Sequence, residues 1–241
     1  MVFDYRCCIT GAIGVGKSCA YEAVAKTLKA EYKDKFRAIR EYIDAEGIQE
    51  TSKHLLNLYL RGQLSDACFQ NYIQSYYVNE LLTNYEPGQI ILMERSMSDS
   101  VAIFCNIANR KNKLSDVDLA LMYNNCINCD CVNDFPNYFI KNFEVSVIKT
   151  EDKLQTYNDI MKVIESDIKD GIKNRVICLS NDAETCYDRV IERSRSCESY
   201  SFEDIENNVN YYENLYKLLT NNDVKEIRLT DFGYILHGDL S

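Results

Sequence analysis

The chain carries Gly11-Ala12-Ile13-Gly14-Val15-Gly16-Lys17-Ser18 directly after the strand-like segment Tyr5–Thr10, and residues 18–30 that follow have the apolar spacing of a helix. The eight residues match the phosphate-binding pattern G-x-x-x-x-G-K-[ST], in the strand, loop and helix order that this pattern requires. The glycines let backbone N–H groups converge on a phosphate, the lysine adds a positive charge, and the serine hydroxyl can bind Mg²⁺. We therefore predict that residues 11–18 bind a nucleotide, and we reject a chance glycine-rich turn.

The composition narrows the class of protein. A chain of 241 residues with 46% hydrophobic content can bury a full core, and we expect a single domain over residues 1–241. The formal charge of −10 argues against a nucleic-acid partner, which calls for a basic face. No apolar run approaches the roughly 20 residues that cross a membrane, and the N-terminal residues do not resemble a transit peptide. We expect a cytoplasmic protein without a membrane partner.

The cysteines form one cluster that needs an interpretation. The chain has 11 cysteines, of which Cys126, Cys129 and Cys131 lie close together. Three sulfurs without a fourth ligand make a weak zinc site, because the only histidines, His54 and His237, are distant in the sequence. We expect reduced thiols, with structural zinc as the alternative.

Strand-like and helical segments alternate along the chain. The five expected strands are Tyr5–Thr10, Phe36–Ile43, Ile90–Met93, Val176–Leu179 and Glu226–Leu229. This alternation predicts an α/β fold of the P-loop nucleotide-binding kind, with a five-stranded parallel sheet and helices on both faces. Two long segments, Thr51–Tyr85 and Asp99–Cys126, have helical apolar spacing and are expected to stack on each other beside the sheet.

The stretch from about residue 126 to 174 has a less regular pattern. It contains a break at Asn-Asp-Phe-Pro, a possible hairpin at Tyr138–Thr150 and a helical pattern at Leu154–Ile168. We interpret this stretch as an insertion on the core.

Three further motifs accompany the phosphate-binding loop. Glu41 and the triplet Glu94-Arg95-Ser96 come at the ends of expected strands, and Arg193 and Arg195 follow a helical segment later in the chain. In an open parallel sheet, ligands bind beyond the carboxyl ends of the strands. We therefore expect the first two motifs to lie beside the loop.

Taken in order, these motifs resemble the deoxyribonucleoside kinase family, which includes deoxycytidine, deoxyguanosine and mitochondrial-type thymidine kinases. Glu41 matches a strand-end carboxylate of that family, Glu94-Arg95-Ser96 repeats its Glu-Arg-Ser, and Arg193 to Glu198 look like its arginine-bearing lid. Tyr59 and Phe69-Gln70 have the spacing of its sugar-contacting tyrosine and base-contacting glutamine. The resemblance covers roughly residues 5–125 and 175–232.

The resemblance implies a phosphoryl transfer from ATP to a sugar 5′-hydroxyl, with Lys17 on the phosphates. Glu41 is the expected base, Arg95 steadies it, and Glu94 with Ser18 binds Mg²⁺. One or both of the lid residues Arg193 and Arg195 would neutralise the transferring phosphoryl group. The alternatives are an exposed strand-end carboxylate for Glu41, a structural ion pair for Glu94 and Arg95, and a solvated helix face for the arginines. That last reading is favoured most for Arg189.

The resemblance also implies a binding pocket for the nucleoside. Tyr59 and Glu198 are expected at the 3′-hydroxyl, Gln70 at the base edge and Phe104 on the base face. Tyr77 and Ser100 stand where family members that act on deoxycytidine or purines carry an arginine and an aspartate, although Asp99 is adjacent to Ser100. The chain also lacks the tryptophan that lines the family's base pocket. We expect a pyrimidine substrate, with thymidine favoured. Without the resemblance, Tyr59 and Phe104 would be assigned to the core.

Three other functions compete with this reading. A nucleoside monophosphate kinase shares the loop and the lid but needs more basic residues around Tyr59 or Gln70 than the chain has. A non-catalytic kinase-like subunit would not need Lys17, Glu41 and Arg95. Their presence argues against this alternative. A switch GTPase requires Asn-Lys-x-Asp, which does not occur. The resemblance further implies a homodimer formed through the long helices.

Overall fold

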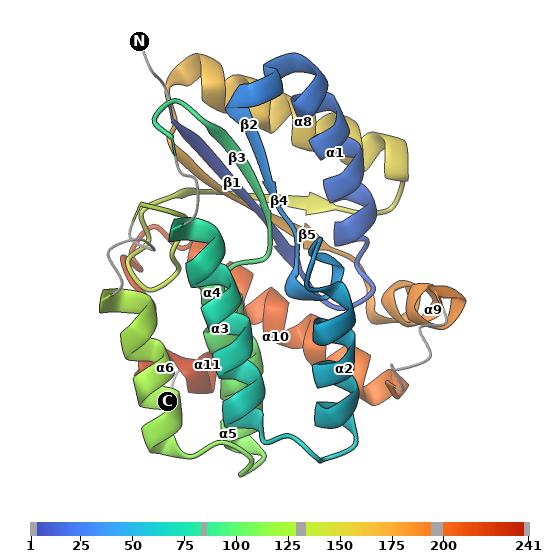
Figure 1. The fold of residues 1–241 in the computed structure, drawn as a ribbon, viewed down its shortest axis with the longest axis vertical. Coiled ribbons are helices and arrows are strands. Elements are labelled where there is room, and N and C mark those ends of the chain that lie inside the picture. The colour runs from blue at the N-terminus through green and yellow to red at the C-terminus, as the bar shows by residue number, and fades with distance from the viewer. Residues whose placement is uncertain (1–3, 83–85, 129–133, 194–199, 239–241) are drawn as a thin grey trace.

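The computed structural model describes residues 4–82, 86–128, 134–193 and 200–238, and within them five strands form one parallel sheet (Figure 1). The strands are β1 (Tyr5–Gly11), β2 (Phe36–Ile39), β3 (Ile90–Glu94), β4 (Glu144–Lys149) and β5 (Asn174–Ser180). Their order across the sheet is β2-β3-β1-β5-β4, and every neighbouring pair is parallel. The predicted five-stranded parallel sheet is therefore confirmed.

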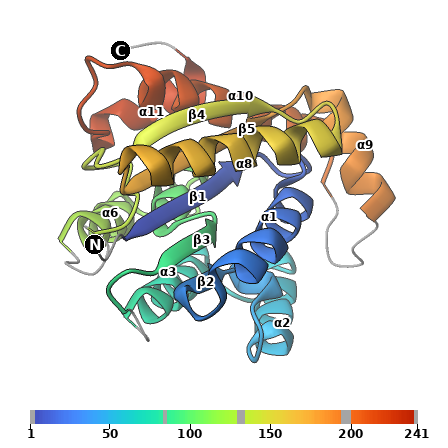
Figure 2. The same cartoon turned by 90° about the horizontal axis from the view of Figure 1, so that it is seen from above.

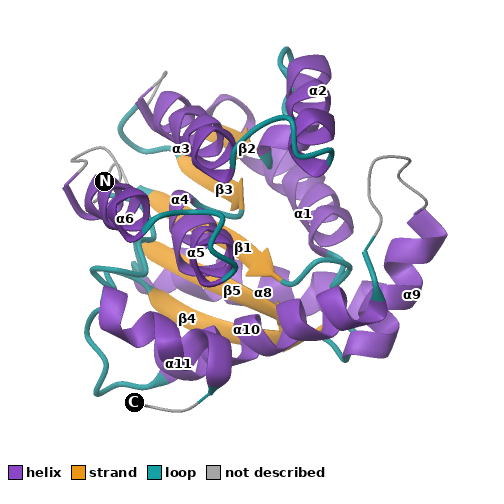
Figure 3. Ribbon diagram, turned by 90° about the horizontal axis from the view of Figure 1, so that it is seen from below, coloured by secondary structure: helices purple, strands orange, loops and turns teal. Residues whose placement is uncertain are grey.

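Helices cover both faces of this sheet, as predicted. The α-helices of the described residues are α1 (Lys17–Tyr32), α2 (Gln49–Leu60), α3 (Asp66–Leu82), α4 (Met97–Asp99), α5 (Asn106–Arg110), α6 (Asp116–Asn128), α8 (Lys153–Asp170), α9 (Ala183–Arg193), α10 (Phe202–Thr220) and α11 (Phe232–His237). Figure 2 shows α1 and α8 across one face, and Figure 3 shows α5, α10 and α11 across the other. Among the described residues, every helix is too short or too polar to cross a membrane.

The central strands are buried because both of their faces are covered. Every residue of β1 and of β3 is buried, which explains the nearly continuous apolar run of β1. The carboxyl ends of these two strands lead into the phosphate-binding loop and into Arg95. Parallel pairing brings these ends to the same edge of the sheet, with Ile9 opposite Glu94.

Short helical turns connect these strands and helices. They are the 3₁₀ turns Lys33–Lys35, Tyr42–Asp44 and Leu229–Asp231, and the π-helical segment Ser100–Cys105. Ser96 forms a capping box with Asp99, and Ser201 forms one with Asp204 at the start of α10. These caps set the points at which the chain turns back into helices beside the strand ends.

The fifth strand is not the one that the sequence pattern indicated. The predicted strand Glu226–Leu229 has no strand pairing, and Glu144–Lys149 is the edge strand that pairs with β5. The apolar content of four residues does not distinguish a strand from an irregular buried segment, and Ile227 is fully buried without being in a strand. Strand β2 is also shorter than predicted and ends at Ile39, so Glu41 lies in the loop that follows.

The interpretation of residues 126–174 as an insertion is wrong for the part that forms β4 and α8. The possible hairpin at Tyr138–Thr150 is absent, because Glu144–Lys149 pairs in parallel with β5 and not with a neighbouring segment of its own. Helix α8 then packs against α1 on the sheet. Both elements belong to the sheet and its covering layer. The two long helical segments each contain more than one helix, and the second contacts the first through the π-helical segment and α3.

Candidate active site

The phosphate-binding loop is shaped by close contacts with the backbone around it. Gly11 and Gly14 have φ values of 153° and 81°. A Cβ atom on Gly11 would lie 2.6 Å from the Leu179 carbonyl oxygen, and one on Gly14 would lie 2.2 Å from that of Cys186. Side chains are therefore excluded at both positions, and the loop rests directly on β5 and α9.

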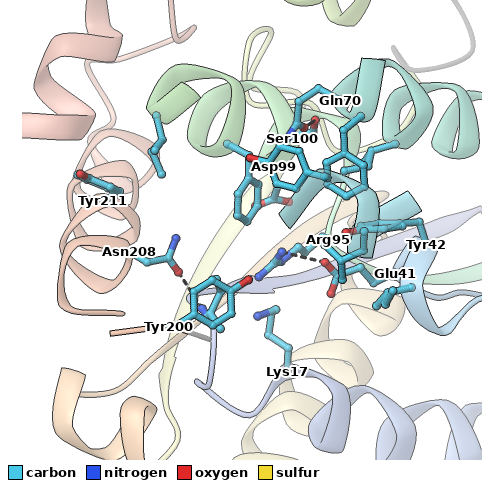
Figure 4. A pocket seen from close by; sticks show the side chains of 18 of the residues that line it. Lys17, Glu41, Tyr42, Gln70, Arg95, Asp99, Ser100, Tyr200, Asn208 and Tyr211 are labelled. Atoms are coloured by element: carbon cyan, nitrogen blue, oxygen red, sulfur yellow. Dashed lines mark hydrogen bonds and ion pairs between the residues drawn. The ribbon is translucent and has the colours of Figure 1, made fainter. Parts of the chain in front are cut away.

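Lys17 points into the cavity beside this loop (Figure 4). Its side chain is buried, and Nζ donates to the Ala12 carbonyl oxygen at 2.7 Å. Burial, together with the nearby Arg95 charge, lowers the pKa of Lys17 to about 7. The position of the Lys17 amine beside the loop suits the binding of an anionic ligand.

Two oxygen-bearing side chains meet where α1 begins and β3 ends. Ser18 Oγ donates to Glu94 Oε1 at 2.7 Å, and Glu94 is the buried last residue of β3. Burial, followed by the negative charge of Glu41, raises the pKa of Glu94. A hydroxyl and a carboxylate so close together form an oxygen-rich position next to the loop.

Arg95 and Glu41 form an ion pair across the cavity. Arg95 Nη1 donates to Glu41 Oε1 at 2.8 Å, and the Arg95 guanidinium lies 4.9 Å from the centre of the Phe104 ring. Arg95 has a φ of 61°, a left-handed conformation that costs about 1–3 kcal/mol in a residue other than glycine. Its backbone N–H donates to the Ile9 carbonyl oxygen at 2.9 Å, which helps to hold this conformation.

The far end of the cavity is built from uncharged polar groups. Ser100 Oγ donates to Gln70 Oε1 at 2.8 Å, and both side chains are buried. Tyr77 lines the same end, but its hydroxyl donates to the Glu94 carbonyl oxygen at 3.0 Å. Ser100 and Phe104 lie on the π-helical segment that follows α4, and this segment shapes the wall of the cavity.

The Asp99 carboxylate is fully hydrogen-bonded within the protein. Its carboxylate accepts hydrogen bonds from Thr10 Oγ1, from the N–H and hydroxyl of Ser96, and from the hydroxyls of Tyr138 and Tyr212. Five donors satisfy a buried carboxylate without help from a ligand. Asp99, which is adjacent to Ser100, therefore does not offer an unpaired negative charge to a ligand at the Gln70–Ser100 end of the cavity.

Tyr59 lines the cavity with its ring packed on Phe69. The two ring centres lie 4.4 Å apart at an interplanar angle of 11°. The Tyr59 hydroxyl donates to Asp66 Oδ1 at 2.8 Å. Asp66 is a neighbour that the sequence pattern did not suggest.

One cavity of about 280 Å³ is lined by most of these groups, whereas the predicted site residue Glu94 is not part of its lining. It extends from the phosphate-binding loop to the Gln70–Ser100 pair. Its lining includes most of the predicted site residues, namely Ile13, Gly14, Lys17, Ser18, Glu41, Tyr59, Gln70, Tyr77, Arg95, Ser100, Phe104 and Arg193. The predicted site residues Arg195 and Glu198 lie outside the described residues, as do Cys129 and Cys131 of the cysteine cluster. Where the structure is described, no three His, Cys, Asp or Glu side chains gather in a way that suits a metal ion.

Two residues at the loop were missed by the sequence analysis. Arg189 of α9 donates from Nη1 to the Val15 carbonyl oxygen at 2.9 Å and from Nη2 to the Thr150 carbonyl oxygen at 2.7 Å. The alternative of a solvated helix face, to which the sequence analysis gave most weight at Arg189, is wrong for this residue. Its position one helical turn before Arg193 was the available signal. Asn208 of α10 accepts a hydrogen bond from the Ile13 N–H, and no local pattern indicated this contact.

Comparison with known proteins identifies the family of the chain. The family model described as deoxynucleoside kinase matches residues 7–140, more than half of the 241-residue chain, so the chain belongs to the deoxynucleoside kinase family. The predicted family is thus confirmed, and the protein is a nucleoside-phosphorylating enzyme.

Solved structures with a similar fold include two of a deoxyadenosine kinase from M. mycoides. The one with the product dCMP and a flexible dCDP shares 17% identity, covers 90% of this chain and 85% of its own, and has a TM-score of 0.57. The one with bound dATP shares 18% identity, covers 91% of this chain and 88% of its own, and has a TM-score of 0.53. At these identities the likeness shows the fold. No curated protein matches the chain.

Proposed function

We propose that the protein transfers the γ-phosphoryl group of ATP to the 5′-hydroxyl of a pyrimidine deoxyribonucleoside, with thymidine favoured, in nucleotide salvage. The observation that carries this proposal is the Glu41–Arg95 pair, which lies in one cavity between the phosphate-binding loop and the uncharged Gln70–Ser100 end. Phosphoryl transfer depends on positioning and charge neutralisation, and the cavity offers both.

The donor end of the cavity fits the phosphates of ATP. We assign Lys17 to the β- and γ-phosphates, together with the loop N–H groups other than those of Ile13 and Val15, which bond within the protein. Arg193 lines the same cavity as Lys17. Ser18 and Glu94 are hard oxygen donors that suit Mg²⁺, which supplies positive charge against the phosphates when bound. We assign Arg195 to the same neutralising role from its place in the motif.

At the acceptor end, Glu41 takes the proton of the 5′-hydroxyl, and Arg95 holds the carboxylate in place. Tyr59 is assigned to the 3′-hydroxyl, together with Glu198. The 2.8 Å bond between Glu41 and Arg95 sets the direction of the carboxylate before a substrate arrives.

The base end favours a pyrimidine because of its groups and its size. The Gln70 amide offers one donor and one acceptor to a base edge, and Phe104 covers the base face. Tyr77 is bulky and fixed by its bond to the Glu94 carbonyl oxygen, which leaves less room for a purine. The M. mycoides enzyme of similar fold is a deoxyadenosine kinase that also holds dCMP, so deoxyadenosine and deoxycytidine are the competing acceptors to test.

The test is phosphate transfer from ATP·Mg²⁺ to each of the four natural deoxynucleosides and to dTMP, with wild type and Glu41→Gln in parallel. We expect the highest kcat/KM with a pyrimidine nucleoside, and near loss of turnover in the variant. Preferred transfer to deoxyadenosine would overturn the pyrimidine assignment. Transfer to dTMP alone would identify a monophosphate kinase, and ATP binding without any transfer would identify a non-catalytic subunit.

We also propose a cytoplasmic homodimer formed through α3 and α6. A groove between these helices is lined by uncharged residues, including Gln74, Asn125 and Leu82. The Gln74 side chain is 3% exposed, and neither of its amide atoms has a hydrogen-bond partner within the described part of the chain. Leu82 and Leu121 are 64% and 57% exposed on these helices. An uncharged face is where two copies with a charge of −10 approach with least repulsion.

Light scattering at micromolar concentration tests the dimer. We expect the mass of two chains for wild type and of one chain for Leu121→Glu, because the new carboxylate would be buried in the interface. Leu154→Glu on α8 is a control, since Leu154 is exposed on the opposite face of the sheet. A wild-type mass of one chain would refute the dimer.

A further inference from the structure

The phosphate-binding loop is held by a residue from a helix nearly 200 positions later. The Ile13 N–H donates to Asn208 Oδ1 at 2.8 Å, and the Asn208 side chain is buried on α10 (Figure 4). Because an N–H group only donates, the amide oxygen of Asn208 must face the loop. The contact therefore defines the orientation of the Asn208 side chain as well as the position of Ile13.

A second contact holds the loop two residues further on. The Val15 carbonyl oxygen accepts from Arg189 Nη1 at 2.9 Å and from Thr150 Oγ1 at 2.8 Å. Thr150 follows the edge strand β4, and Arg189 lies on α9, so these donors come from elements other than α10. Ile13 and Val15 flank Gly14, and each is tied to the surrounding fold through a backbone group.

The loop needs such contacts because of its composition. Gly14 and Gly16 have positive φ values of 81° and 103°, and glycine loses more conformational freedom on ordering than any other residue. A loop with these residues samples many conformations unless its surroundings select one. An anion site made from backbone N–H groups works only when those groups already converge.

We propose that Asn208 is a positioning residue for the donor phosphates, and that with Arg189 and Thr150 it forms a two-sided clamp on Gly14. The clamp holds the loop in its phosphate-binding conformation before ATP binds. This inference rests on the proposed binding of ATP by residues 11–18. The Asn208 amide oxygen acts through Ile13 and does not itself contact the phosphates.

The test compares wild type with Asn208→Leu, which has similar size and no hydrogen-bond acceptor. We expect Asn208→Leu to bind ATP·Mg²⁺ about three- to tenfold more weakly in titration calorimetry, the range for one lost hydrogen bond. Hydrogen exchange of the peptide that contains Ile13 should rise in the variant before any ligand is added. KM for the nucleoside and kcat at saturating ATP should stay close to wild type.

Asn210→Ala is the matched control, because Asn210 is exposed on the same helix. It should bind ATP and exchange hydrogen like wild type. Should Asn208→Leu fail to fold, Arg189→Met removes the other side of the clamp and should show the same ATP-specific loss. Unchanged ATP affinity in a folded clamp variant would overturn the inference. Absence of ATP binding in wild type would instead refute the proposed donor site, and the clamp role with it.

Discussion

Arg95 Nη1 lies 2.8 Å from Glu41 Oε1, and this pair joins the loop after β2 to the end of β3. Neither residue lies in the ladder of the sheet, and Arg95 has the left-handed backbone conformation. Strain of this kind persists where the surroundings impose it, and it is common at functional sites. The pair is therefore the natural starting point for tests of the site.

Replacement of Glu41 by Gln should reduce turnover without loss of ATP binding. Gln keeps the size of the side chain but does not accept the 5′-hydroxyl proton, so kcat should fall about 10²- to 10⁴-fold. Steady-state kinetics and ATP titration on the same preparation check this. A kcat within threefold of wild type would show that Glu41 is not the base.

Gly14→Ala should abolish ATP binding or destabilise the fold. The new Cβ would lie 2.2 Å from the Cys186 carbonyl oxygen, so the loop or α9 must move. Gly62→Ala is the matched control, because Gly62 has a φ of 68° but no atom within 4 Å of a new Cβ. The control should lose about 1–2 kcal/mol of stability and keep its ATP affinity, as calorimetry and denaturant unfolding can show. Normal ATP binding by Gly14→Ala would contradict the contact.

Ser100→Ala should weaken the preference among bases. The change removes the hydrogen bond to Gln70 Oε1, so the buried amide is free to turn and loses its defined donor and acceptor directions. We expect the ratio of kcat/KM between thymidine and deoxycytidine to move toward one by about three- to tenfold. KM for ATP serves as the internal control and should not change. An unaltered ratio would indicate that Ser100 does not orient Gln70.

Tyr59→Phe should affect only substrates that carry a 3′-hydroxyl. The variant keeps the ring stacked on Phe69 but loses the hydroxyl that is bonded to Asp66. For a 2′-deoxynucleoside we expect kcat/KM to fall about three- to tenfold, and for the matched 2′,3′-dideoxynucleoside to stay near the wild-type value. Equal losses with both substrates would assign Tyr59 to packing and not to the sugar.

Local patterns predicted much of the fold, and most of the predicted site residues line the cavity. The phosphate-binding loop was recognisable because its eight residues are consecutive, and β1, β3 and β5 were recognisable as short apolar runs. Glu41, Glu94 and Arg95 followed from the rule that ligands bind beyond strand ends, and the structure brings all three to the edge where β3 ends. Their chemical roles remain predictions until the variants are measured.

Other features required the folded chain. The edge position of β4 depends on pairing with β5, about 30 residues away, and Glu226–Leu229 has a similar local pattern without that pairing. Asp99 is adjacent to the expected base-pocket residue Ser100, but its carboxylate accepts hydrogen bonds from Thr10, Tyr138 and Tyr212. Because these donors lie far from Asp99 in the sequence, no local pattern indicates the contacts.

The phosphate-binding loop separates what the sequence determines from what the tertiary structure determines. The sequence established its glycines, Lys17 and Ser18, because backbone freedom, charge and a hydroxyl belong to the residues themselves. The tertiary structure decided what holds the loop, since Asn208 reaches Ile13 from 195 positions away and Arg189 reaches Val15 from 174. Residue types define which chemistry is possible, and packing defines which groups meet, because a hydrogen bond forms only when the fold brings donor and acceptor to about 3 Å.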